Sequence, residues 1–175
     1  MWGTARGWRI SVGLALTSTG AWTDDDCKLF GLVIGSCKGQ ALWEALTILV
    51  AIRAWAPLWR QERCILHVRS DSKAALGALM KERSKVANIN FVAREVAMII
   101  VEGAYPVTLV WSHVPGKSHV WADALSRLCE PGSDAVVPRA LATMRATPVE
   151  RRGPEWYLTG LPSGGVEPEV DGLSP

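Results

Sequence analysis

The 175-residue sequence has no uninterrupted apolar run long enough to span a bilayer. Its longest such run, residues 45–56, is broken by Thr47 and Arg53. No continuous apolar segment follows the basic residues near the amino terminus, so we expect no signal peptide. The four cysteines form no C-x-x-C pair and have no zinc-ribbon spacing. These absences argue against a membrane protein and favour a reduced intracellular compartment, either the cytoplasm or the nucleus.

The sequence also has little net charge, only +2, so bulk charge does not define a partner. What it has is a globular composition, with 49% hydrophobic residues and nine tryptophans, which a disordered chain would not carry. Most of the 10 prolines lie after Glu130. We therefore predict one folded domain over residues 1–130 and a Pro/Gly-rich, mostly flexible tail over residues 131–175.

Hydrophobic spacing predicts an α/β fold. Helical patterns cover residues 41–55, 72–79, 88–102 and 118–128. Strand-like patterns cover residues 8–17, 29–34, 64–68 and 107–111, the second entered through the acidic loop 24–26. This order describes a mixed sheet with an antiparallel hairpin first and crossovers later, flanked by helices.

Glu44 is the only acid in the strongest predicted helix, and it shares a face with Ile48, Ala51 and Trp55. A carboxylate on an apolar stripe is costly unless it is paired or meets a metal ion. A structural alternative is that Glu44 pairs with an arginine such as Arg69, or reaches solvent near the helix start.

Asp71 follows a short apolar strand and precedes a helix, which is where open α/β sheets place their ligands. Asp123 lies in the first turns of the last predicted helix, among apolar residues. Each acid could equally serve as a helix cap or a dipole-favoured surface charge. If Glu44, Asp71 and Asp123 converge, their mutual repulsion calls for cations, and hard carboxylate ligands suit Mg²⁺ or Mn²⁺.

Three segments carry a family resemblance. Residues 111–128 (WSHVPGKSHVWADALSRL) resemble the ending of retroelement ribonuclease H domains, whose pattern is H-[IV]-P-G-K-x-N-x-x-A-D-x-L-S-R. Residues 40–46 resemble that family's first helix with its catalytic glutamate, and residues 69–72 resemble its aspartate at the end of strand four. The likeness spans residues 2–128 in the family's order and is most similar to the reverse-transcriptase-linked retrotransposon branch.

This resemblance implies a five-stranded mixed sheet and endonucleolytic hydrolysis of the RNA strand of an RNA–DNA hybrid, with two Mg²⁺ (or Mn²⁺) ions and a metal-activated water. It also implies a possible origin within a larger reverse transcriptase polyprotein. Carried over by position, the catalytic and metal-binding residues are Glu44, Asp71 and Asp123. The residues expected at the nucleic acid are Ser72, Lys73, Arg94, Lys117 and His119, for which solvated surface positions are the alternative.

The chain departs from the family at its first strand. That strand ends in a further aspartate, whereas this sequence has no acid before Asp24. We therefore expect the central first strand and its aspartate to be absent, which would leave two unpaired strand edges.

Two alternatives follow: a catalytically inactive fragment that acts as a nucleic-acid-binding or structural module, and an unrelated α/β small-molecule-binding domain whose acids are caps. A zinc site formed by His113, His119 and Cys129 is disfavoured by its spacing.

Overall fold

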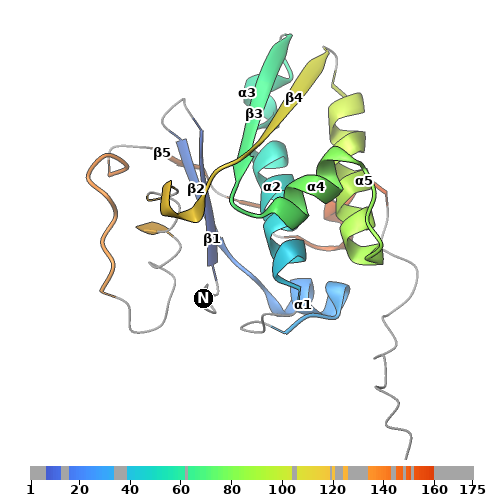
Figure 1. Cartoon of the computed structure of the whole chain (residues 1–175), viewed down its shortest axis with the longest axis horizontal. Coiled ribbons are helices and arrows are strands. Elements are labelled where there is room, and N and C mark those ends of the chain that lie inside the picture. Colours follow the sequence, from blue (N-terminus) through green and yellow to red (C-terminus); the bar gives the residue numbers. More distant parts are fainter. Residues whose placement is uncertain are drawn as a thin grey trace, which may run out of the picture.

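A computed structural model of the chain describes residues 7–12, 16–33, 39–61, 63–103, 106–118, 120, 124–125, 134–142, 145–147, 149–150 and 152–159. Within these residues the protein is α/β, as predicted, with five α-helices and two separate sheets. Helices α2, α4 and α5 pack against one another beside strands β3 and β4, and the β1–β2 hairpin stands apart from those strands (Figure 1).

The first sheet contains the predicted hairpin. Strand β1 (Gly7–Val12) pairs antiparallel with β2 (Leu16–Ala21), and β5 (Arg145–Thr147) adds to β2 in parallel. Both hairpin strands therefore lie within residues 7–21, where a single strand was expected over residues 8–17.

The strand expected at residues 29–34 is wrong over its described part, because Leu29 and Phe30 are the last residues of helix α1 (Asp24–Phe30) and residues 31–33 form no strand. The Thr23 hydroxyl accepts a hydrogen bond from the Asp26 N–H, and the Asp26 carboxylate accepts one from the Thr23 N–H. This capping box satisfies two otherwise free donors, and Asp24, Asp25 and Asp26 suit the positive end of the helix. The acidic segment therefore starts a helix instead of forming a loop.

The predicted central helix is confirmed as α2 (Gln40–Ala54), whose apolar residues form the core between α4 and α5. Gly39 begins it with a φ of 87°, in the left-handed region that favours glycine. A Cβ there would also clash with the tip of the Leu32 side chain, which would have to move. Pro57 ends α2 as expected, and the chain continues as the single turn α3 (Ala56–Trp59), with proline in its first turn.

The second sheet pairs β3 (Cys64–Ser70) with β4 (Val107–His113) in parallel, from Cys64 opposite Val107 to Ser70 opposite His113. The crossover between them contains α4 (Lys73–Met80) and α5 (Ala87–Val101), both of which were predicted. After β4 the chain makes a 3₁₀ turn, η1 (Gly116–Ser118). One face of β3 packs on the helices, whereas Ile65, on the other face, is 61% exposed.

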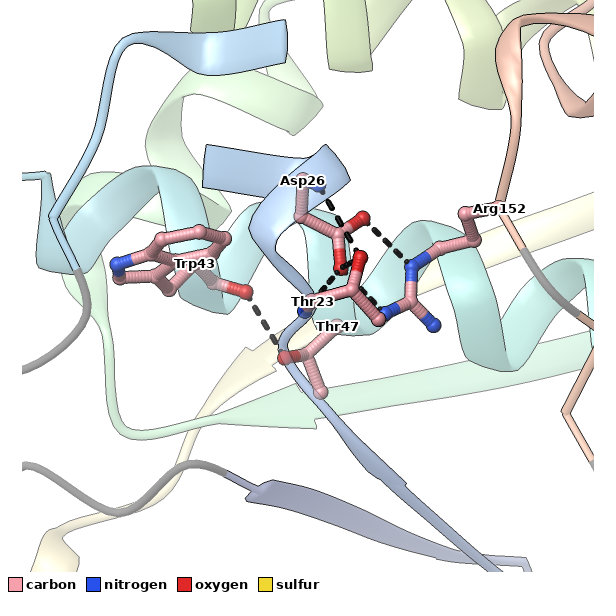
Figure 2. Close-up of polar contacts among 5 residues, drawn as sticks. All are labelled: Thr23, Asp26, Trp43, Thr47 and Arg152. Carbon is pink, nitrogen blue, oxygen red and sulfur yellow. Dashed lines mark hydrogen bonds and ion pairs between the residues drawn. The ribbon is translucent and has the colours of Figure 1, made fainter. Parts of the chain in front are cut away.

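The segment after residue 130 differs from the expected, mostly flexible tail. Residues 152–159 include a second 3₁₀ turn, η2 (Pro154–Trp156), and Trp156 and Tyr157 are buried in the core. The Arg152 guanidinium reaches the buried Asp26 carboxylate of α1, beside Thr23 (Figure 2). The two buried aromatic rings and the ion pair, which includes two hydrogen bonds, hold this segment against the helices.

The buried Glu95 carboxylate of α5 forms a second anchor for the same segment. It accepts hydrogen bonds from the backbone N–H of Leu158 at 2.8 Å and of Thr159 at 2.6 Å, and from the Thr159 hydroxyl. The Glu95 carboxylate is therefore satisfied by hydrogen bonds within the fold, and its role is structural.

In the part of the chain that the structure describes, no helix combines the length and the apolarity needed to cross a bilayer.

Candidate functional site

Glu44 lies on α2, one turn after Gln40 and on the side that faces the end of β3. Its carboxylate accepts a hydrogen bond from the Gln40 amide at 3.2 Å and another from the Ser72 hydroxyl. Both donors are neutral. Among the described residues Glu44 makes no ion pair, and Arg69, the arginine considered as its partner, is exposed on β3.

Ser72 links this carboxylate to the start of α4. Its hydroxyl oxygen accepts the Ala75 N–H at 3.2 Å as the helix N-cap, which leaves the hydroxyl proton free to be donated to Glu44. The Ser72 N–H in turn donates to the Ser70 hydroxyl at 3.1 Å. These bonds fix the two residues on either side of Asp71.

Asp71 is half-buried, and its negative charge acts on Glu44. Burial raises the pKa of Glu44 above its ordinary 4.5, and the Asp71 charge raises this pKa further, while the hydrogen bonds from Ser72 and Gln40 oppose the shift. We call Glu44 and Asp71 the acidic pair. The sequence analysis predicted that Glu44, Asp71 and Asp123 converge; of these, Asp71 is near enough for its charge to act on Glu44.

The acidic pair lies at the carboxyl ends of two parallel strands. Ser70 is paired with His113, and the Val114 N–H donates to the Ser70 carbonyl at 3.0 Å, so the end of β4 is held beside the end of β3. The turn η1 follows directly and carries the exposed Lys117. This edge of a parallel sheet is the usual position of a ligand site in α/β proteins.

The remaining predicted residues have different positions. Lys73 is exposed in the first turn of α4, two residues after Asp71, whereas Arg94 is exposed on α5 and shares no described contact with the acidic pair. Asp123 and His119 lie outside the described residues, as does Cys129. The third predicted carboxylate therefore has no position here.

A divalent cation would suit the two described acids because it would compensate their negative charge. Their charges repel, and the hydrogen bonds to Glu44 come from neutral donors, so a cation would offset charge that the fold leaves uncompensated. The described residues hold no cluster of three or more histidine, cysteine or acidic side chains suited to a metal. A metal site here would need ligands beyond the acidic pair.

An apolar groove beside the acidic pair was not predicted. Its floor is formed by Leu76, Gly77, Met80 and Trp111, between α4 and the end of β4. The sequence signals were a glycine inside a helix and an exposed methionine one turn later, on the same side as Lys73.

Comparison with known proteins adds no relative. No family model matches the chain, no curated protein matches it significantly, and no solved structure does so either.

Proposed function

We propose that this chain is a retroelement-derived, ribonuclease H-like module that acts on RNA–DNA hybrids. One observation carries the proposal. Glu44 and Asp71 were selected from separate segments of the sequence; the pKa of Glu44 is raised mainly by burial, and the charge of Asp71, at the carboxyl end of the parallel strand β3, adds a smaller contribution in the same direction. Acids arranged in this way at a ligand edge, with a perturbed pKa, are candidates for a catalytic site.

The arrangement of the strands also supports the proposal. The resemblance led us to expect a central strand to be missing between the hairpin and β3. Among the described strands, β1 pairs with β2 and β3 pairs with β4, in two separate sheets. A division of the sheet at this point is what the loss of that strand would produce.

In this proposal Glu44 and Asp71, with Asp123 from the last predicted helix, would hold Mg²⁺ or Mn²⁺. When bound, such ions supply charge stabilisation and an activated water for in-line attack on a phosphodiester. The chain's own residues orient the carboxylates: Ser72 and Gln40 fix Glu44, and the serines on either side of Asp71 fix the turn that carries it. Exposed Lys73 and Lys117 provide positive charge for the nucleic acid backbone.

The decisive experiment is cleavage of an end-labelled RNA–DNA hybrid with Mg²⁺ and with Mn²⁺. It should compare this chain with a version extended by an amino-terminal strand that ends in an aspartate. Glu44→Gln should abolish cleavage, whereas Glu102→Gln, a change at an acid 44% exposed at the end of α5, should not. If the extended version is also inert with both metals, the enzymatic proposal is wrong.

A non-catalytic nucleic-acid-binding module is the second candidate, motivated by the family's first aspartate, for which the sequence offers no acid before Asp24. It predicts hybrid binding that weakens steeply with salt and does not lead to cleavage. An absence of binding at low salt would contradict it.

A further inference from the structure

The apolar groove is open, with a volume of about 190 Å³. Met80 is 58% exposed at one side of its floor, and Trp111 is only partly covered at the other. Between them the surface of α4 is bare at Gly77, where a Cβ would meet no atom within 4 Å. A flat ring could therefore enter the groove and lie over the floor without displacing a side chain.

The polar end of the groove lies near the β3–α4 junction that carries Asp71. It is formed by Lys73, Ser112 and His113. Lys73 is two residues from Asp71, and His113 is the strand partner of Ser70, which precedes Asp71. A molecule that extends from the apolar floor past Lys73 would therefore approach the Asp71 end of the acidic pair.

The charges favour a polyanion over a peptide as the occupant. Among the described residues no acidic side chain lines the groove, and Lys73 is at its polar end. Aromatic rings beside cations bind single-stranded nucleic acids, because bases stack on the ring and phosphates pair with the charge. An uncharged apolar peptide would gain nothing from Lys73.

We propose that the groove between α4 and β4 binds an unpaired base of a nucleic acid strand, stacked over Trp111, with the adjoining phosphate on Lys73. This inference rests on the proposed nucleic-acid function and adds to it a subsite for a single-stranded nucleotide next to the acidic pair. It identifies Trp111 and Gly77 as positioning residues, because one provides the stacking surface and the other leaves the space open.

The test measures binding of a short, 5′-fluorescein-labelled oligouridylate to the full chain by fluorescence anisotropy. Gly77→Leu fills the groove, and should weaken binding roughly 5- to 150-fold, the loss expected for one stacked base. Ala74→Leu adds the same side chain at an exposed position of the same helix, outside the groove, and as the matched control it should keep the wild-type affinity. Leucine is a strong helix former, so both variants should fold, which circular dichroism would verify.

An oligomer of abasic sugar phosphates separates base from phosphate recognition. It should bind more weakly than oligouridylate and should not distinguish Gly77→Leu from the wild type. Lys73→Gln should weaken both probes and lower the salt slope by about one. Equal affinity of Gly77→Leu and the wild type for oligouridylate would overturn the proposal. The proposal would also be overturned if a strand-forming apolar peptide shifted the Met80 methyl resonance and oligouridylate did not.

The two proposals fail separately. Hybrid cleavage without groove-dependent oligouridylate binding would overturn the base subsite and leave the nuclease proposal standing. Groove-dependent binding without cleavage, even in the extended version, would support the subsite and overturn the nuclease.

Discussion

Replacing Arg152 with methionine should destabilise the protein more than an ordinary surface substitution. The guanidinium donates to Asp26 from Nε at 2.9 Å and from Nη2 at 2.6 Å, and the two side chains are 4% and 0% exposed. Methionine would preserve much of the apolar contact with Trp22, whose ring lies 5.5 Å from the guanidinium carbon. What it cannot replace is the positive charge, so of the described contacts the buried Asp26 carboxylate would keep only the hydrogen bonds from Thr23.

Breaking a buried ion pair from one side costs about 3–5 kcal/mol, because the remaining charge stays desolvated. For a chain of this size, each kcal/mol corresponds to about 2–4 °C in Tm, so Tm should fall by roughly 6–20 °C. Urea unfolding followed by far-ultraviolet circular dichroism measures the free-energy change directly. An unchanged m-value would show that the effect is on stability and that the transition remains two-state.

Two controls make the result interpretable. Glu102→Gln breaks the ion pair with Arg60, where the two atoms are 3.6 Å apart and the side chains are 34% and 44% exposed. Such an exposed pair should contribute about 0–1 kcal/mol. The double variant Asp26→Leu/Arg152→Met removes both charges and should recover much of the loss. The reasoning is refuted if Arg152→Met costs no more than Glu102→Gln.

Three further changes test other parts of the structure. Burial and the Asp71 charge raise the folded-state pKa of Glu44 above 4.5, so stability present below pH 4.5 is lost as pH rises through the folded value. Glu44→Gln should therefore have a higher urea midpoint than the wild type at neutral pH and an equal one in acid; a lower midpoint at neutral pH would contradict this. Gly77→Ala should stabilise the protein by about 0.5–1 kcal/mol in the same assay, because the added methyl group meets no neighbour; destabilisation would show that the helix surface is not bare. The buried Tyr157 hydroxyl has no hydrogen-bond partner in the structure, and its burial raises the pKa of Tyr157 above its ordinary 10, so stability should fall as pH rises beyond that value. Tyr157→Phe should remove this alkaline loss, and an unchanged pH profile would refute the assignment.

The central part of the fold was predictable because its signals are local. Apolar spacing gave α2, α5 and β4, and the run of cap-forming residues around Asp71 placed the β3–α4 junction correctly. The same reasoning failed at α1, where three consecutive acids were interpreted as a loop. The capping box at Thr23 and Asp26 has the required spacing, but the acid at its third helical position is Asp, not the usual Glu or Gln.

The sequence identified the two acids of the candidate site but did not predict the apolar groove. Glu44 was identified because an acid on an apolar helix stripe is unusual, and Asp71 because it follows a strand. The criterion of an acid on an apolar helix stripe would also have selected Glu95 of α5, which lies between Val92 and Ile99 on the buried side. The rule finds buried acids but does not separate functional from structural ones. The groove depends on how the side of α4 meets the end of β4, which sequence periodicity does not specify.

The hydrogen-bond and ion-pair partners of these acids separate the structural ones, the buried Asp26 and Glu95, from Glu44, which is only partly buried. Asp26 is held by a guanidinium and by Thr23, and Glu95 accepts two backbone N–H bonds and a hydroxyl bond, so the fold compensates each negative charge. Glu44 is different: its described donors are neutral, and the nearby Asp71 carries the same charge. Folding would be easier with an uncharged residue at this position, so the carboxylate is poorly explained as a contribution to stability. An external cation would remove that energetic conflict, and this is the physical reason for placing a site at Glu44 and not at Asp26 or Glu95.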